Sequence, residues 1–416
     1  MIWKFRMENQ TLSERLKALG VQIGARDLPT PQPQATHGIE EEVGGIWIST
    51  PYGDTYQIEE SYPCDHQHGL YPLQVSTPPD IVAEYAREPD LVDIEPEAYT
   101  FLDIETTGLS GSTGTYAFLI GAGRFYEGGF HIKQFFLPAP QSEPAQLTAF
   151  ADFIYGSRAL ITFNGKAFDV PVLQTRFTLQ GLTTPFKPAP SHLDLLHLAR
   201  RLWRERLPSR TLLDLEGQIL GILRSQADIS SWIIPQLYFD YLTTGDARLL
   251  KGVFYHNAKD ILGLVTLFNH VNILLNNPLN RPETPAIDLA GIGRLYETLG
   301  RAEDARQLYE QCLLLGLPQE LHQQTEKRLS VLYKRAEDWE SASRIWEAAA
   351  LAGHIYAHVE LAKYFEHQRK DIPAALHWTQ SALEHFAHSL IQDADLHSDL
   401  ENRRKRLEQK LSRHAE

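Results

Sequence analysis

Residues 99–106, YTFLDIET, run from apolar side chains directly into two carboxylates. The apolar run predicts a buried strand. Side chains two residues apart on a strand point the same way, so Asp103 and Glu105 share one face. Two adjacent carboxylates repel each other unless a cation lies between them. The pair alone leaves two interpretations open: an ordinary strand face at the surface, or one side of a metal site.

Two more carboxylates occur beside predicted buried elements. Asp169 follows a predicted strand at 159–164 and begins a helix, with Asn164 in the turn and Pro171 in the first helical turn. This position suits either a helix cap or a functional group. Asp260 lies on a predicted helix among apolar neighbours, where a carboxylate is costly unless it is paired or metal-bound.

Between residues 98 and 275, strand-like and helix-like segments alternate. Three strand segments in succession predict a meander, and strands and helices alternate after it. This order is typical of a mixed α/β domain, with a sheet flanked by helices. The predicted strands cover 99–106, 117–125, 130–137 and 159–164, and the predicted helices cover 146–154, 169–179, 191–203, 210–222 and 247–271.

The sequence before this domain, residues 1–97, predicts an irregular N-terminal region with one β-hairpin. The hairpin turns at Pro51–Asp54, between two segments with strand-type alternation. No fold of its own is predicted for this region, which we expect to pack on the domain that follows. Residues 276–286 are a linker by composition.

Residues 287–390 are predicted to form an all-α domain of helical repeats. Three similar segments place Ala305, Ala342 and Ala375 at matching positions, at intervals of 37 and 33 residues. These intervals lie on either side of the 34-residue period of tetratricopeptide (TPR) helix pairs. The segment therefore resembles about three TPR units, and residues 391–416 are predicted as a basic helical tail.

The composition, with 43% hydrophobic and 22% charged residues, is ordinary for a soluble globular protein. The chain has two distant cysteines, which excludes a disulfide framework and fits a reducing compartment. No run approaches the roughly 18 apolar residues of a membrane helix, and the first residues lack the apolar core of a signal peptide. We therefore expect a cytoplasmic protein with no membrane contact.

Residues 100–271 resemble the DEDD exonuclease superfamily of the RNase H-like fold. In that superfamily, four acidic residues from three motifs hold two divalent ions. The first motif matches as Asp103 and Glu105, the second as Asp169 and the third as Asp260. The resemblance implies an RNase H-like α/β fold and metal binding by all four carboxylates.

Further motifs extend the resemblance. The middle motif N-x-x-x-F-D-x-P, at 164–171, is similar to that of the proofreading domains of family B DNA polymerases. The chain also resembles the bacterial YprB-like group of RNase H-like proteins, many of which carry C-terminal TPR repeats. The resemblance to this group includes the segment HQHG around His68 and the stretch R-x-x-x-D-I-S-S-W-I-I-P from Arg224 to Pro235.

One position departs from the superfamily. Its members carry either Tyr four residues before the last Asp or His five residues before it, whereas here His256 is four and Tyr255 five residues before Asp260. Positions four apart share a helix face, so His256 is predicted beside Asp260. Histidine titrates near neutrality, and we expect His256 to orient or deprotonate the attacking water, with Tyr255 as a packing residue or a backup.

The resemblance implies a two-metal-ion phosphodiester hydrolase, most simply a 3′–5′ exonuclease on single-stranded DNA or RNA. Two Mg²⁺ or Mn²⁺ ions, roughly 4 Å apart, would activate water and stabilise the leaving oxygen. The alternatives are a structure-selective endonuclease of the same fold and a TPR scaffold that binds nucleic acid with little catalysis. TPR arrays bind peptide segments in a groove, so a protein partner is expected as well.

The net charge of −14 argues against binding nucleic acid by bulk basic charge, but local contacts remain available. Asn164, Lys166, Thr106 and Tyr255 are candidate substrate-binding residues. A basic run with Trp203 in it could follow a phosphate backbone and stack a base, or be a solvated helix face; its arginines are Arg200, Arg201, Arg204, Arg206 and Arg210.

Two minor signals have ordinary interpretations. Asp194 lies near the place where related nucleases keep an acidic residue, but a helix cap is the simpler role. Cys64, His66 and His68 form C-x-H-x-H, a possible zinc trio without an evident fourth ligand.

Overall fold

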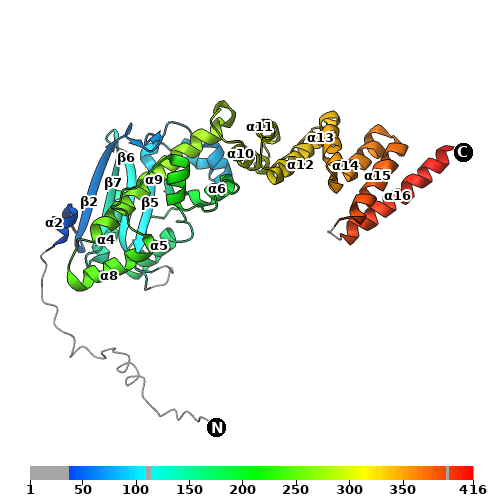
Figure 1. The fold of residues 1–416 in the computed structure, drawn as a ribbon. Helices are drawn as coiled ribbons and strands as arrows, with labels where there is room; N and C mark the ends of the chain where they lie inside the picture. The colour runs from blue at the N-terminus through cyan, green and yellow to red at the C-terminus, as the bar shows by residue number, and fades with distance from the viewer. Residues whose placement is uncertain (1–36, 109–113, 390–392, 416) are drawn as a thin grey trace, which may run out of the picture.

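The computed structural model describes residues 37–108, 114–389 and 393–415 (Figure 1). The first 36 residues of the predicted irregular region therefore lie outside the described part. The described chain consists of one mixed sheet domain and an all-helical C-terminal region of paired helices. This confirms the predicted fold class for both parts.

The domain is built on a seven-stranded sheet. Its middle strands form the predicted antiparallel meander, β5–β6–β7, and two parallel strands continue it beyond β5. The strand order is β1 (Ile46–Thr50), β2 (Gly53–Pro63), β7 (Gly129–Phe136), β6 (Ala117–Tyr126), β5 (Tyr99–Thr106), β8 (Ala159–Thr162) and β9 (Ser191–Asp194). A separate two-stranded sheet pairs β3 (Gln67–His68) with β4 (Tyr71–Pro72).

The predicted hairpin around Pro51–Asp54 is present as β1 and β2, which are joined between Thr50 and Gly53. Strand β2 also pairs antiparallel with β7, from Tyr56 opposite Phe136 to Pro63 opposite Gly129. The hairpin of the N-terminal region thus completes the edge of the same sheet, while Ile81 and Val82 of the later part pack in the core shared with α9.

The prediction of a helix over residues 191–203 is wrong for its first four residues. Residues Ser191–Asp194 form strand β9, parallel to β8, and helix α6 (Leu195–Leu202) begins only after Asp194. The Asp194 carboxylate accepts a hydrogen bond from the Leu196 amide, which caps the helix. A four-residue strand is too short for its alternation to stand out from the helical spacing that follows.

Alternation along β5 divides its side chains between the two faces of the sheet. Phe101 belongs to the core cluster shared with α9 (Leu250–Asn276), which crosses that face (Figure 1). Leu102 and Ile104 pack on the other face, with α4 (Glu143–Phe153) and α5 (Asp169–Leu179). Asp103 and Glu105 therefore share the α9 face with Phe101, as the alternation predicted.

Helix α9 is long and apolar enough to span a membrane by length and composition, with a mean hydropathy of 1.2 in its most apolar window. However, 83% of that window is buried inside the protein, and Ile261, Leu264 and Phe268 belong to the core on the sheet. The helix is the central core helix of the domain. Because α9 is buried, a polar side chain on this helix costs free energy unless it has a hydrogen-bond or ion-pair partner.

The C-terminal helices extend from the sheet domain in a row (Figure 1). Ala305, Ala342 and Ala375 each lie four residues after a helix N-cap and have no exposed surface, so the matching sequence positions are structurally equivalent. The paired helices are α10 (Ala286–Thr298) with α11 (Ala302–Leu315), α12 (Gln319–Arg335) with α13 (Trp339–Leu351), and α14 (Ile355–Tyr364) with α15 (Ile372–Ala387); α16 (Ala394–Ala415) follows. Shorter helices of the sheet domain are α2 (Ile39–Val43), α3 (Asp80–Ala86), α7 (Leu212–Leu215) and α8 (Ile234–Thr244).

The helical region is joined to the sheet domain by close packing of α10 on α6. Leu202 and Trp203 at the end of α6 share one core cluster with Leu289 and Ile292 of α10. A Cβ atom on Gly291 would lie 2.3 Å from the Leu202 carbonyl oxygen, so only glycine permits this approach.

Gly291→Ala should therefore lower the free energy of unfolding by about 1–3 kcal/mol, because the added methyl group meets rigid backbone. Urea unfolding followed by circular dichroism measures the change. Gly217→Ala is the matched control, since a Cβ there has no heavy atom within 4 Å. Equal stability of the two variants would show that α10 does not pack on α6 in this way.

Candidate metal centre

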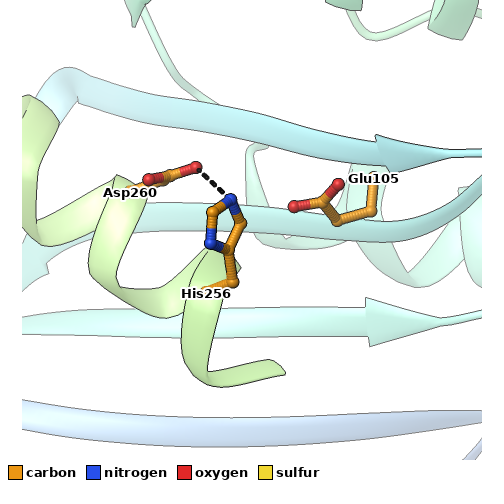
Figure 2. A group of neighbouring side chains, drawn as sticks. All are labelled: Glu105, His256 and Asp260. Carbon is orange, nitrogen blue, oxygen red and sulfur yellow. Dashed lines mark ion pairs between the residues drawn. The ribbon is translucent and has the colours of Figure 1, made fainter. Parts of the chain in front are cut away.

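Strand β5 and helix α9 bring the first and last acidic motifs together. Among the residues that the structure describes, Glu105, His256 and Asp260 are the one group of three metal-ligating side chains whose ligand atoms all lie within 4.8 Å of one another (Figure 2). His256 and Asp260 are one turn apart on α9, with His256 Nε2 at 3.5 Å from Asp260 Oδ2. His256 thus lies beside Asp260, as the spacing predicted.

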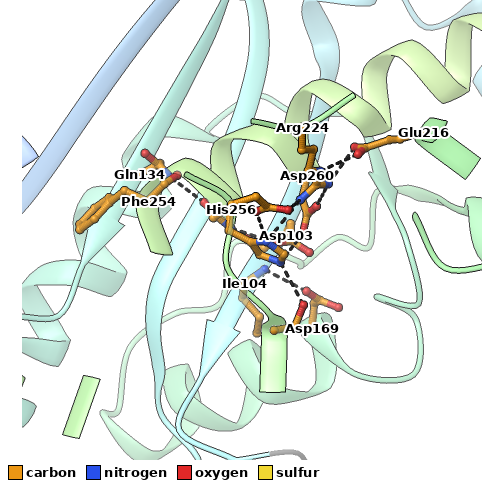
Figure 3. Close-up of polar contacts among 12 residues, drawn as sticks. Asp103, Ile104, Gln134, Asp169, Glu216, Arg224, Phe254, His256 and Asp260 are labelled. Carbon is orange, nitrogen blue, oxygen red and sulfur yellow. Dashed lines mark hydrogen bonds and ion pairs between the residues drawn. The ribbon is translucent and has the colours of Figure 1, made fainter. Parts of the chain in front are cut away.

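Asp169 reaches the same place from the first residue of α5. Its Oδ1 accepts a hydrogen bond of 3.1 Å from the backbone amide of Ile104, which lies between Asp103 and Glu105 on β5. The turn before α5 depends on Asn164, whose φ of +69° is a conformation that asparagine tolerates better than most residues. The structure therefore brings Asp103, Asp169 and Asp260 to one place, from β5, α5 and α9 (Figure 3). Glu105 lies with Asp260 in the same place (Figure 2).

Asn257 holds Asp103 in place. Its side-chain amide donates to Asp103 Oδ2 at 2.9 Å and to the Asp103 carbonyl oxygen at 3.2 Å. Gln134 on β7 donates in turn to Asn257 Oδ1 at 2.9 Å and to the Phe254 carbonyl at 2.8 Å. This chain of hydrogen bonds fixes which atom of Asn257 faces Asp103. The motifs did not predict Asn257, although a polar residue at a buried helix position was the signal for it.

The negative charges of the four carboxylates repel one another. Burial, reinforced by the charges of Asp260 and Asp169, raises the pKa of Asp103 and of Glu105 well above the usual range. Burial and the charges of Asp194 and Asp260 raise the pKa of Asp169 to about 7, although the Ile104 amide opposes the shift. A divalent cation would relieve this repulsion, and an all-oxygen donor set suits Mg²⁺ or Mn²⁺. The residues present fit such ions.

Arg224 supplies positive charge at one side of the cluster. Its guanidinium donates to both oxygens of Glu216, at 2.6 and 2.8 Å, and also binds Asp260. The side chain of Arg224 is 4% exposed and that of Glu216 is fully buried. Burial alone would lower the pKa of Arg224, but Glu216 and Asp260 raise it, so the guanidinium stays charged. Arg224 therefore restrains the Asp260 carboxylate in a fixed orientation.

His256 is oriented by the same segment of chain. Its Nδ1 lies 2.7 Å from Asp228 Oδ1, and its Nε2 lies 3.1 Å from Ser231 Oγ. Arg224 Nη1 is also 3.3 Å from Nδ1; a guanidinium can only donate, so this longer contact competes with that of Asp228 for the role of Nδ1. A proton on Nδ1 satisfies the closer Asp228 carboxylate. That tautomer leaves Nε2, on the side of Asp260 and Ser231, as the acceptor.

Glu216, Asp228 and Ser231 were not predicted as site residues. The stretch Arg224–Pro235 was part of the family resemblance, but the resemblance assigned no role to its residues. The structure shows that this stretch contacts both His256 and Asp260, so its polar residues support the site. Only tertiary contacts, across 25 to 36 residues of sequence, reveal this.

The candidate substrate-binding residues lie close in sequence to the carboxylates and make local contacts. Thr106 donates to the Gly108 carbonyl, and Tyr255 accepts from the Ser225 amide at 3.2 Å. The amides of Asn164 and Lys166 both donate to Asp194, at 2.8 and 3.1 Å. Asp194 thus ties the turn before α5 to the start of α6. This confirms its expected role as a cap and adds a second one.

Two weaker predictions are corrected. Trp203 has no exposed surface and cannot stack a base, and Arg201 and Arg206 of the basic run bind Arg294, Thr298 and Asp288 of α10. That run joins the two parts of the chain. The trio Cys64, His66 and His68 is not among the metal-ligating groups of the described residues, since Cys64 donates instead to the Gly128 carbonyl.

Comparison with known proteins agrees with this architecture. A profile of the RNase H superfamily matches residues 100–272, which span β5 to α9. The chain is also 32% identical over 338 residues to a Bacillus subtilis (strain 168) protein described as "Uncharacterized protein YprB", covering 79% of this chain and 80% of that one. The chain belongs to the YprB family. This chain thus combines an RNase H superfamily domain with a long helical C-terminal region, and an RNase H superfamily domain suggests hydrolysis of nucleic-acid phosphodiesters.

Removing Arg224 should destabilise the folded chain strongly. Arg224→Met leaves Glu216 buried without its cation, which costs about 3–5 kcal/mol. Chemical denaturation measures the loss. The double variant Arg224→Met/Glu216→Gln should recover part of it, and Arg248→Met, which removes an exposed ion pair with Asp246, should change little. A single variant as stable as the double one would rule out the buried pair.

Without divalent ions, stability should depend on pH through the crowded carboxylates. Folding raises the pKa of Asp169 from 3.8 to about 7, so the protonated carboxyl stabilises the folded state. This stabilisation is complete below about pH 4 and is lost as the pH rises through 7. Asp169→Asn keeps a neutral group at every pH. In EDTA it should raise the Tm more at about pH 8 than at about pH 4. Asp152→Asn, at an exposed position, is the control and should change the Tm little at either pH. If Asp169→Asn changed the Tm equally at both pH values, the raised pKa of Asp169 would be contradicted.

Proposed function

We propose that this protein is a two-metal-ion phosphodiester hydrolase that acts on DNA or RNA, as a 3′–5′ exonuclease on single strands. The observation that carries the proposal is the convergence of four carboxylates, from β5, α5 and α9, on one place in an RNase H superfamily domain. The exonuclease activity and its polarity rest on the resemblance to the DEDD exonucleases.

Asp103, Glu105, Asp169 and Asp260 would hold two Mg²⁺ or Mn²⁺ ions. When bound, such ions lower the pKa of water and neutralise charge that develops on phosphate oxygens. The fit rests on three features of the chain: an all-oxygen donor set, burial, and raised pKa values that a cation would reverse.

His256 would take the proton from the attacking water. The Asp228 carboxylate keeps the Nδ1 proton in place, so Nε2 presents a lone pair on the same side as Asp260. Arg224 holds Asp260, and Asn257 holds Asp103, so both carboxylates are positioned before substrate arrives. Tyr255 instead contacts the Ser225 amide and would brace the loop next to the site.

Lys166 and the turn at Asn164 would meet the substrate backbone. Lys166 lies in the turn that leads to Asp169, its side chain is 40% exposed, and its ammonium is 3.8 Å from Glu88. A pair of this length leaves the ammonium available for a phosphate oxygen. Since the protein is acidic overall, such local contacts would have to position the phosphate.

The helical region would bind a protein partner as a TPR-like array. A pocket of about 420 Å³ lies between α12, α14 and α15, with Lys327, Tyr356 and Phe386 among its lining residues. Apolar side chains with both lysines and carboxylates among them suit an extended peptide segment. The free thiols of Cys64 and Cys312 support the proposal of a cytoplasmic location.

Asp103→Ala should reduce cleavage by at least about 100-fold, because it removes a carboxylate that both ions would need. The assay uses purified protein and end-labelled single- and double-stranded DNA and RNA, with Mn²⁺ or EDTA. EDTA should abolish cleavage as well. Exposed Asp152→Ala on α4 is the matched control and should cleave like the parent.

A ladder that shortens from the 3′ end supports the exonuclease, whereas discrete internal products indicate the structure-selective endonuclease. Binding without cleavage would favour a nucleic-acid-binding scaffold. An Asp103→Ala variant that cuts as fast as the parent would refute the metal assignment.

A further inference from the structure

Trp232 is the most exposed tryptophan of the described residues, with 79% of its surface accessible. It lies in the short 3-10 turn Ser231–Ile233 that leads into α8. An indole left in water forgoes the burial that stabilises most large aromatic side chains. Single exposed apolar side chains are common on protein surfaces, but an exposed indole offers a free face on which a base can stack.

The backbone under Trp232 is held on both sides. Ser231 Oγ contacts His256 Nε2 at 3.1 Å, and Ile234 is fully buried in the core between β6 and α8. The Ile233 amide closes the turn on the Ser230 carbonyl at 3.0 Å. The ring is thus uncovered while the chain that carries it is fixed, which lowers the entropy lost on stacking.

The position of Trp232 relates it directly to the metal centre. Ser231, its neighbour in sequence, contacts His256. His256 in turn lies beside Asp260 (Figure 3). Consecutive Cα atoms are about 3.8 Å apart, so the backbone of Trp232 is carried on the same short turn that contacts His256. Leu223, 90% exposed and adjacent to Arg224, adds a second apolar side chain on the same segment.

The charge of the chain favours stacking as the source of affinity. At a net charge of −14, and next to four carboxylates, phosphates gain little from bulk electrostatics. A flat aromatic ring binds any unpaired base through its face, independently of sequence. Bases inside a duplex already stack on their neighbours and offer no free face.

We propose that Trp232 is the stacking platform for an unpaired base next to the scissile phosphate, and that it gives the site its preference for single strands. This assignment rests on the proposed nuclease function. It replaces the stacking role that the sequence suggested for the buried Trp203.

Binding is measured in the Asp103→Ala background, so that substrate stays intact, with Ca²⁺ present. The probes are fluorescein-labelled oligodeoxythymidylate, oligouridylate and a DNA duplex of the same length, followed by fluorescence anisotropy. Adding Trp232→Ala should weaken binding of both single strands by on the order of tenfold to a hundredfold. Duplex binding should change little.

Trp232→Phe should recover most of the affinity, because it keeps an aromatic face. Tyr155→Ala is the matched control, since Tyr155 is 86% exposed but lies after α4, and should bind like its parent. Single-strand binding should also quench tryptophan fluorescence, and the quenching should disappear in Trp232→Ala.

Unchanged single-strand affinity in Trp232→Ala overturns the stacking assignment. So does an equal loss for single strands and duplex. Metal-dependent cleavage by the protein with Asp103 intact, measured on the same oligonucleotides, tests the proposed function separately. A protein that neither binds nor cleaves any of them overturns both.

Discussion

Four carboxylates crowded where β5, α5 and the central helix α9 meet are the constraint on which the rest of the site depends. Burial and mutual repulsion raise the pKa values of Asp103, Glu105 and Asp169, so the chain must compensate for the charge that it buries. It does so with the guanidinium of Arg224, the amide of Asn257 and the backbone amide of Ile104. These partners position the carboxylates and leave oxygen lone pairs available for cations.

The sheet, the core helix and the four carboxylates could be predicted because they follow from local rules. Alternation places Asp103 and Glu105 on one face of β5, and a spacing of four places His256 beside Asp260. The buried repeat alanines, such as Ala305, likewise follow from periodicity. In these cases the contacts that matter lie within one helix or strand. Where they join separate elements, as for the four carboxylates, the order of the family motifs predicted which residues meet.

The partners that hold the site could not be predicted, because they come from distant segments. The family resemblance included Arg224 but gave it no role, and Glu216 lay in a predicted helix, yet together they form a buried ion pair. Strand β9 was too short to show its own period, and Trp203 could not be told from Trp232 until burial was known. Burial is a property of the packed chain, so composition near a motif does not reveal it.

The central claim is that these carboxylates bind paired divalent cations. Anomalous diffraction from crystals grown with Mn²⁺, at a concentration that supports cleavage, tests it most directly. Two manganese peaks are expected in contact with Asp103, Glu105, Asp169 and Asp260, and at least one should vanish in Asp103→Ala. A map without manganese at these side chains would contradict the claim.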